Sequence, residues 1–151
     1  MPLESFEDIM KEKWYDKFFK PYRKGKYRLI SKKMECKFKR QCKKQGYADC
    51  DVWEMRSWFV GTAKPILLEM VEKTNNHPDE ITFEEWREII KRMAHLLDIM
   101  DIWDDTTLRK ELGIPKNDVS EDTIKRISEK RNEAKNEFFY LFNKWFYDLW
   151  Y

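Results

Sequence analysis

The chain has 151 residues, of which 38% are charged and 16% are aromatic, with only four glycines and five prolines. This composition favours long helices over a turn-rich sheet, and the length suits one domain with a substantial hydrophobic core. Three cysteines without a CxxC pair, and no run of ~20 apolar residues, argue against a disulfide framework, a zinc site and a membrane-spanning helix. We therefore expect free thiols, no metal or cofactor, and no membrane partner.

The net charge of +2 conceals an uneven distribution along the chain. Residues 11–44 hold 15 Lys/Arg and 3 Asp/Glu, a local net of +12, whereas residues 45–151 hold 15 against 22, a net of −7. Two interpretations of the basic segment stay open. It neutralises the acidic remainder of its own fold, or it presents cations to a phosphate-bearing partner. Aromatic residues among the cations suit stacking on nucleobases, and they suit the buried stripe of a helix equally well.

The basic segment is expected to form two helices. The first begins near Ser5, whose side chain can cap it, and stops at Pro21. The second covers residues 27–46, where apolar residues recur at helical spacing and a glycine provides the stop. A short strand over residues 27–30 is the alternative for the start of this element.

A third helix is predicted over residues 52–73. Asp51 and Glu54, three positions apart, form a capping signature at its start. Pro65 lies inside this helix, where it removes one backbone hydrogen bond and crowds the carbonyl four residues before it. We therefore expect a kink near residues 61–65.

The clearest local signal follows a loop at residues 74–80. Thr82 and Glu85 have the spacing of a capping box, and Ile81 can pack against Trp86 as a hydrophobic staple. Apolar residues then track 3.6 residues per turn, at Trp86, Ile89, Ile90, Met93, Leu97 and Met100. This helix is expected to lie at the centre of the core.

Two more helices complete the chain, a short one at residues 106–112 and a long one that begins at Asp118. The long helix ends in "EFFYLFNKWFYDLWY", residues 137–151, in which nine residues are aromatic. A helix that is apolar nearly all round is stable only when neighbours surround it. We predict that this tail is mainly core, with any remaining face used for a partner such as a second copy of the chain.

Carboxylates offer the one pattern that resembles an enzyme site. The motifs "EEWRE" and "DIMD" resemble the paired acidic motifs with which all-helical nucleotide pyrophosphohydrolases hold magnesium. However, Glu88 and Asp98 lie about 15 Å apart along one predicted helix, too far for one metal cluster. A hard cation would instead need the cluster of Asp98, Asp101, Asp104 and Asp105, which can equally well face cations of the chain. No glycine-rich phosphate loop, HExxH or nucleophile motif is present, so we predict a protein that is not an enzyme.

Several short motifs follow one another in a fixed order along residues 47–101 and 137–151. They are an Asp-x-Trp start, a proline shortly before a leucine in an apolar helix, a loop proline, a Glu-Glu-Trp helix start and a Leu-Trp ending. The residues are Asp51, Trp53, Pro65, Leu67, Pro78, Glu84, Glu85, Trp86, Leu149 and Trp150. In this pattern the chain resembles a family of small helical proteins of bacteriophages and prophages. The resemblance implies a cytoplasmic protein of a bacterial host cell, and small phage proteins of this kind often counter host defence.

Together these observations predict an all-α fold, a compact bundle of five to six helices with a long aromatic C-terminal helix. One domain, 1–151, is expected to combine a basic helical segment, 5–46, with a helical core, 51–151. The leading hypothesis for function is a non-catalytic inhibitor of host defence that sequesters a nucleotide-type signal, an anionic small molecule. Its predicted contacts pair aromatic faces with cations: Trp14, Tyr22, Arg23, Tyr27, Arg28, Trp53, Arg56 and Trp58. The alternatives are a module that binds a host defence protein or nucleic acid through the basic segment, and a metal-dependent nucleotide hydrolase.

Overall fold

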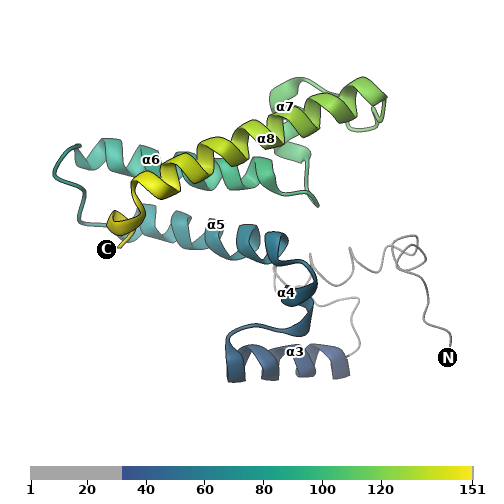
Figure 1. Ribbon diagram of the computed structural model, residues 1–151, viewed down its shortest axis with the longest axis horizontal. Coiled ribbons are helices and arrows are strands. Elements are labelled where there is room, and N and C mark those ends of the chain that lie inside the picture. The colour runs from purple at the N-terminus through teal and green to yellow at the C-terminus, as the bar shows by residue number, and fades with distance from the viewer. Residues whose placement is uncertain (1–31, 151) are drawn as a thin grey trace. The chain divides into compact units, whose positions relative to one another are not determined.

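The computed structural model describes residues 32–150, and over this range the fold is all-α, as predicted (Figure 1). Its elements are α3 (Lys32–Gln45), α4 (Asp49–Trp53), α5 (Met55–Lys73), α6 (Phe83–Met100), α7 (Thr106–Leu112), α8 (Glu121–Lys144) and the short 3₁₀ helix η1 (Phe146–Asp148). The described residues thus contain six α-helices. The helix predicted from Ser5 to Pro21, and the part of the second predicted helix before residue 32, lie outside the described residues.

The chain divides into two compact units, and the boundary falls inside α5, between Phe59 and Val60. In its described part, the first unit comprises α3, α4 and the first turn of α5. The second unit comprises the rest of α5 and all the later elements. The prediction of a single domain stays a prediction.

In the first unit, α3 packs against α4 through buried apolar side chains, among which Phe38 and Cys50 have no exposed surface. The helix α4 begins after Ala48, whose backbone N–H donates to the carboxylate of Asp51 over 2.8 Å. The prediction that Asp51 starts this helix was therefore wrong by three residues, because its carboxylate reaches back to the preceding turn. The backbone at Glu54 then leaves the helical conformation, with φ −142° and ψ 70°, and this change divides the predicted helix 52–73 into α4 and α5.

The helix α5 continues through Pro65 as one element, and the predicted kink stays a prediction. In the second unit it buries Leu67, Met70 and Val71 along one side. Ile66 is 55% exposed, so α5 is covered on one side and open on the other. Burial on one side suits a helix at the edge of a bundle, although the open side of α5 also carries the apolar residues Ile66 and Leu68.

The helix α6 lies at the centre of the core of the second unit, as predicted. Its capping box is present, since Thr82 N–H donates to a Glu85 carboxylate oxygen over 2.8 Å and Glu85 N–H donates to Thr82 Oγ1 over 3.3 Å. Trp86, Ile90 and Leu97 are completely buried. The helix α8 runs antiparallel to α6 and packs along it (Figure 1).

The aromatic tail is core on one side only, which corrects the prediction that it is mainly core. Phe138 has no exposed surface and Trp145 has 4%, and the Trp145 ring packs edge-on against Trp86 with the centroids 5.6 Å apart. The tail leaves five aromatic side chains between 46% and 89% exposed: Phe139, Tyr140, Phe146, Tyr147 and Trp150. The reason is that α8 packs mainly against α6, and one neighbouring helix covers one stripe rather than the whole circumference.

Candidate functional site

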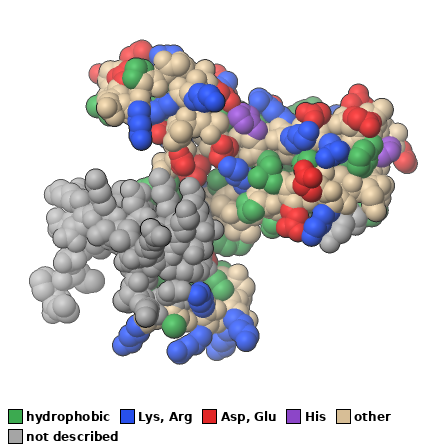
Figure 2. All heavy atoms as spheres, turned by 180° about the vertical axis from the view of Figure 1, so that it is seen from behind, with side chains coloured by type: hydrophobic (Ala, Val, Ile, Leu, Met, Phe, Trp, Pro, Cys, Tyr) green, Lys and Arg blue, Asp and Glu red, His purple; other side chains and the backbone are tan. Residues whose placement is uncertain are grey.

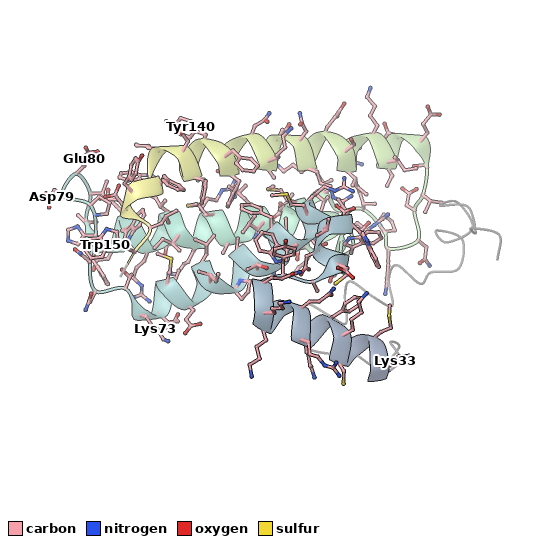
Figure 3. All side chains as sticks on the ribbon, turned by 60° about the horizontal axis from the view of Figure 1, so that its bottom comes forward. Lys33, Lys73, Asp79, Glu80, Tyr140 and Trp150 are labelled. Atoms are coloured by element: carbon pink, nitrogen blue, oxygen red, sulfur yellow. The ribbon has the colours of Figure 1, made fainter. Side chains whose placement is uncertain are left out.

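One side of α3 carries a row of cations, which we call the basic face: Lys33, Lys37, Arg40 and Lys44. Their spacing of four, three and four residues places them on the same side of an α-helix, and all four are exposed. Eleven steps of about 1.5 Å separate the first of these residues from the last, so the row is about 16 Å long. Figure 2 shows Lys and Arg side chains gathered over α3 at the bottom of the view, and Figure 3 shows Lys33 pointing outward from this helix.

One cation of the basic face is held by the protein itself. The ammonium of Lys37 lies 2.7 Å from Asp49 Oδ2, and the backbone N–H of Asp49 donates to Gln41 Oε1 over 3.1 Å. The hydrogen bond from Lys37, followed by one from Gln41, lowers the pKa of the Asp49 carboxyl. Neither Lys33 nor Arg40 has an ion-pair partner among residues 32–150. Lys33 and Arg40 therefore carry positive charge that no acid among residues 32–150 neutralises.

The ligand contacts predicted from the sequence lie mostly beyond the described part of the chain: Trp14, Tyr22, Arg23, Tyr27 and Arg28. Of the others, Trp53 ends α4 with 53% of its surface exposed, and Trp58 is half-buried. The Arg56 guanidinium forms a two-bond pair with the Glu54 carboxylate, at 2.6 and 3.0 Å. This pairing compensates the charge of Arg56. That these residues contact a ligand stays a prediction.

The basic face was missed as a site by sequence reasoning, which selected cations with aromatic neighbours. The signal for it is nevertheless local, because the spacing of Lys33, Lys37, Arg40 and Lys44 can be read from the sequence. The missing information was the burial of Phe38 on another side of α3, which fixes the side of the helix that faces water.

The acidic cluster near the end of α6 is bound by groups of the same unit. Asp98 accepts hydrogen bonds from the Lys64 ammonium and from the Thr107 hydroxyl, the latter over 2.8 Å. Burial acts to raise the pKa of Asp98, but these two hydrogen bonds outweigh it and lower the pKa. The carboxylate of Asp98 is therefore ionised at neutral pH, because its hydrogen-bond partners favour the charged form more than burial disfavours it.

The other three acids of the predicted cation cluster are also engaged locally, and Asp104 Oδ1 accepts the backbone N–H of Thr106 over 3.2 Å. Asp101 Oδ1 accepts the backbone N–H of Trp103 over 2.8 Å, and Asp105 pairs with Arg109 over 2.6 Å. In the part of the chain that the structure describes, no three His, Cys, Asp or Glu side chains are placed to hold a metal ion. These acids therefore bind groups at the end of α6, at the start of α7 and in the turn between the two helices.

The buried thiol of Cys50 is expected to resist alkylation. Burial, with a smaller contribution from the charge of Asp51, raises the pKa of Cys50 from 9.0 to about 12. Because the thiolate is the nucleophile, a rise of this size leaves about a thousandfold less reactive species at pH 8. A variant with Cys36→Ser and Cys42→Ser isolates this thiol, and mass spectrometry of maleimide-treated native protein should find it unlabelled.

The matched variant, with Cys42→Ser and Cys50→Ser, leaves the exposed Cys36 as the single thiol. It should be labelled within minutes under the same conditions, and denaturant should make both variants react alike. Equal labelling rates for the two native variants would show that Cys50 is accessible.

No protein-family model, curated protein or solved structure matches this chain. The resemblance to phage proteins stays a prediction. None of the helices within residues 32–150 combines the length and the hydrophobicity that a membrane crossing requires.

Proposed function

We propose that the protein is a non-catalytic binding module that holds the phosphate backbone of nucleic acid on the basic face of α3. The observation that supports this most directly is the row of four exposed cations, Lys33, Lys37, Arg40 and Lys44, over about 16 Å. Phosphates recur every 3.4 Å of axis along one strand of duplex DNA, so a row of this length meets several of them. The phosphates of a single nucleotide would occupy only one end of the row.

Single strands are the proposed form of the nucleic acid. The unit that carries the basic face also exposes the rings of Tyr47, at 45%, and Trp53, at 53%. Unpaired bases stack on such rings, and single-strand binding proteins combine stacking with a cationic track for the backbone. A duplex would use the cations but not the rings.

Sequestration of a nucleotide-type signal is the second candidate function. It is favoured by the density of cations and aromatic residues in residues 11–31, which lie outside the described residues. A role against host defence in the bacterial cytoplasm would fit either candidate. A metal-dependent hydrolase is not proposed, because Lys64 and Arg109 hold the carboxylates of Asp98 and Asp105.

The proposal is tested by titrating fluorescently labelled oligonucleotides with the full chain and recording anisotropy from 50 to 300 mM KCl. A 20-nucleotide single strand should bind more tightly than a 20-base-pair duplex. The logarithm of the binding constant should fall with the logarithm of salt concentration with a slope of about −3 from these four cations alone. Tight binding of a cyclic dinucleotide, without binding of any oligonucleotide at 50 mM KCl, would reject this proposal in favour of the second candidate.

A further inference from the structure

The second unit contains a pocket beside the loop that precedes α6, whereas the acidic cluster lies at the C-terminal end of this helix. Its volume is ≈ 260 Å³, and its walls are formed by Asn76, His77, Pro78, Asp79, Asp148 and Trp150. Two segments about 70 residues apart build it, the loop between α5 and α6 and the residues around η1. Figure 3 shows Asp79 and Trp150 at the same end of the helices.

The loop wall is held by hydrogen bonds among its own groups. The buried Thr74 donates its hydroxyl proton to the carbonyl of Asn76 over 2.9 Å, and Asn76 Oδ1 accepts the backbone N–H of His77 over 3.0 Å. The carbonyl of Pro78 lies 2.9 Å from His77 Nδ1 and accepts the backbone N–H of Ile81 over 3.3 Å. The backbone of this wall is thus fixed by its own groups, and none of these bonds uses the side chain of Asp79.

The second wall is anchored to the core through Trp145. The backbone N–H of Asp148 donates to the carbonyl of Trp145 over 2.9 Å, and that of Trp150 donates to the carbonyl of Asp148, also over 2.9 Å. Trp145 is in turn buried against Trp86. The carboxylate of Asp148 and the indole of Trp150, which is 57% exposed, are therefore carried on a short backbone segment tied to the packed core.

The charged groups around this pocket favour a positively charged ligand. Neither Asp79 nor Asp148 forms an ion pair with another described residue. Residues 74–86 contain four acids and no Lys or Arg, and residues 60–151 contain 19 Asp/Glu against 14 Lys/Arg. The face of an indole also attracts cations, through the negative charge on its π system. Two carboxylates and an indole are a poor set for a bare metal ion, which wants several oxygen ligands.

We propose that this pocket binds an organic cation, an alkylammonium or guanidinium group, between the carboxylates of Asp79 and Asp148 and against the indole of Trp150. The pocket is smaller than the roughly 300–1,000 Å³ of sites for drug-sized ligands, so it takes a small amine or the end of one side chain. A free polyamine and a lysine or arginine side chain of a partner share this chemistry. The site lies in the second unit, and it has the opposite charge preference from the basic face.

The test uses the full chain labelled with 5-fluorotryptophan, in which the Trp150 resonance is assigned by comparison with Trp150→Phe. The ¹⁹F resonance should shift saturably on addition of spermidine, N-acetyl-lysine methylamide or N-acetyl-arginine methylamide. The uncharged N-acetyl-norleucine methylamide should leave it unchanged. A clear preference for spermidine supports a free polyamine as ligand, whereas equal affinity for the single amino-acid probes supports a partner side chain.

Asp79→Asn and Asp148→Asn should each weaken binding of these probes about three- to fivefold, as expected for partly exposed ion pairs. Trp150→Leu keeps an apolar side chain but removes the π face of the indole. This variant should weaken binding of the lysine and arginine probes about two- to fivefold. Calorimetry measures the affinities, because this variant lacks the Trp150 resonance. The matched control is Glu80→Gln, which removes the same charge from a neighbour that does not line the pocket.

The control should change the affinity less than about twofold. The proposal is overturned if Glu80→Gln weakens binding as much as Asp79→Asn, because the general negative field would then account for the effect. It is also overturned if the norleucine probe shifts the Trp150 resonance as much as the lysine probe. Unchanged circular dichroism and an unchanged melting temperature of each variant show that the change in affinity arises at the pocket and not from unfolding.

Discussion

Replacing Phe138 with alanine is expected to lower the free energy of unfolding by about 3–5 kcal/mol. The Phe138 ring has no exposed surface, and it stacks on Phe142 with the centroids 5.6 Å apart and an interplanar angle of 17°. Truncation removes the buried ring and leaves a cavity between α8 and its neighbours, which tightly packed side chains fill only in part. Urea denaturation of the full chain, followed by circular dichroism, measures the loss.

The adjacent Phe139 provides a matched control, because it has the same residue type on the same helix but is 46% exposed. Phe139→Ala should cost about 1 kcal/mol, since the edge contact with Phe138 and part of the burial are lost. Both variants exchange phenylalanine for alanine inside α8, so intrinsic helix propensity affects them equally. Similar losses for the two variants would contradict the one-sided burial of the tail.

Joint replacement of Lys33, Arg40 and Lys44 by alanine should weaken binding of a single-stranded oligonucleotide about a hundredfold at 0.1 M salt. Each lost phosphate contact removes about 0.7 from the slope of the salt dependence, so the slope should become shallower by about two. Alanine is the best helix former, and Lys37 keeps its ion pair with Asp49, so α3 should remain folded. Anisotropy titrations at several salt concentrations measure both quantities.

The control for this variant removes the same charge from the second unit, by replacing Lys116, Lys125 and Lys135 with alanine. All three side chains are exposed and lie on or beside α8. This triple variant should weaken binding less than about threefold, through the loss of long-range attraction alone. If both triple variants lose affinity equally, net charge rather than the basic face would explain the binding.

The elements that could be predicted from the sequence are those with local signals. The start of α6 was predicted correctly, because Thr82 and Glu85 satisfy each other within one turn, and its buried residues follow from an unbroken apolar stripe. The break at Glu54 could not be predicted, because no proline or glycine marks it. The helix before this break, α4, begins after Ala48, because the carboxylate of Asp51 accepts the backbone N–H of Ala48.

The exposure of the tail depends on tertiary packing, which periodicity does not encode. Residues 137–144 are apolar around most of the helix. This pattern indicates that the helix should be buried, but it does not indicate how many neighbouring helices bury it. The pocket is less predictable still, since it joins Asp79 to Asp148 and Trp150 across about 70 residues. By contrast, the basic face was readable from the spacing of its residues, and the burial of Phe38 was needed to show which side of α3 faces water.

The uneven burial of the indoles gives this protein two optical reporters. Trp53 in the first unit and Trp150 in the second are more than half exposed, whereas Trp86 and Trp145 are almost completely enclosed. A neutral quencher such as acrylamide will therefore extinguish the red part of the emission and spare the blue part. The difference between the emission of the native chain and that of Trp150→Phe would follow the surroundings of Trp150, so that events in the second unit can be observed without a dye.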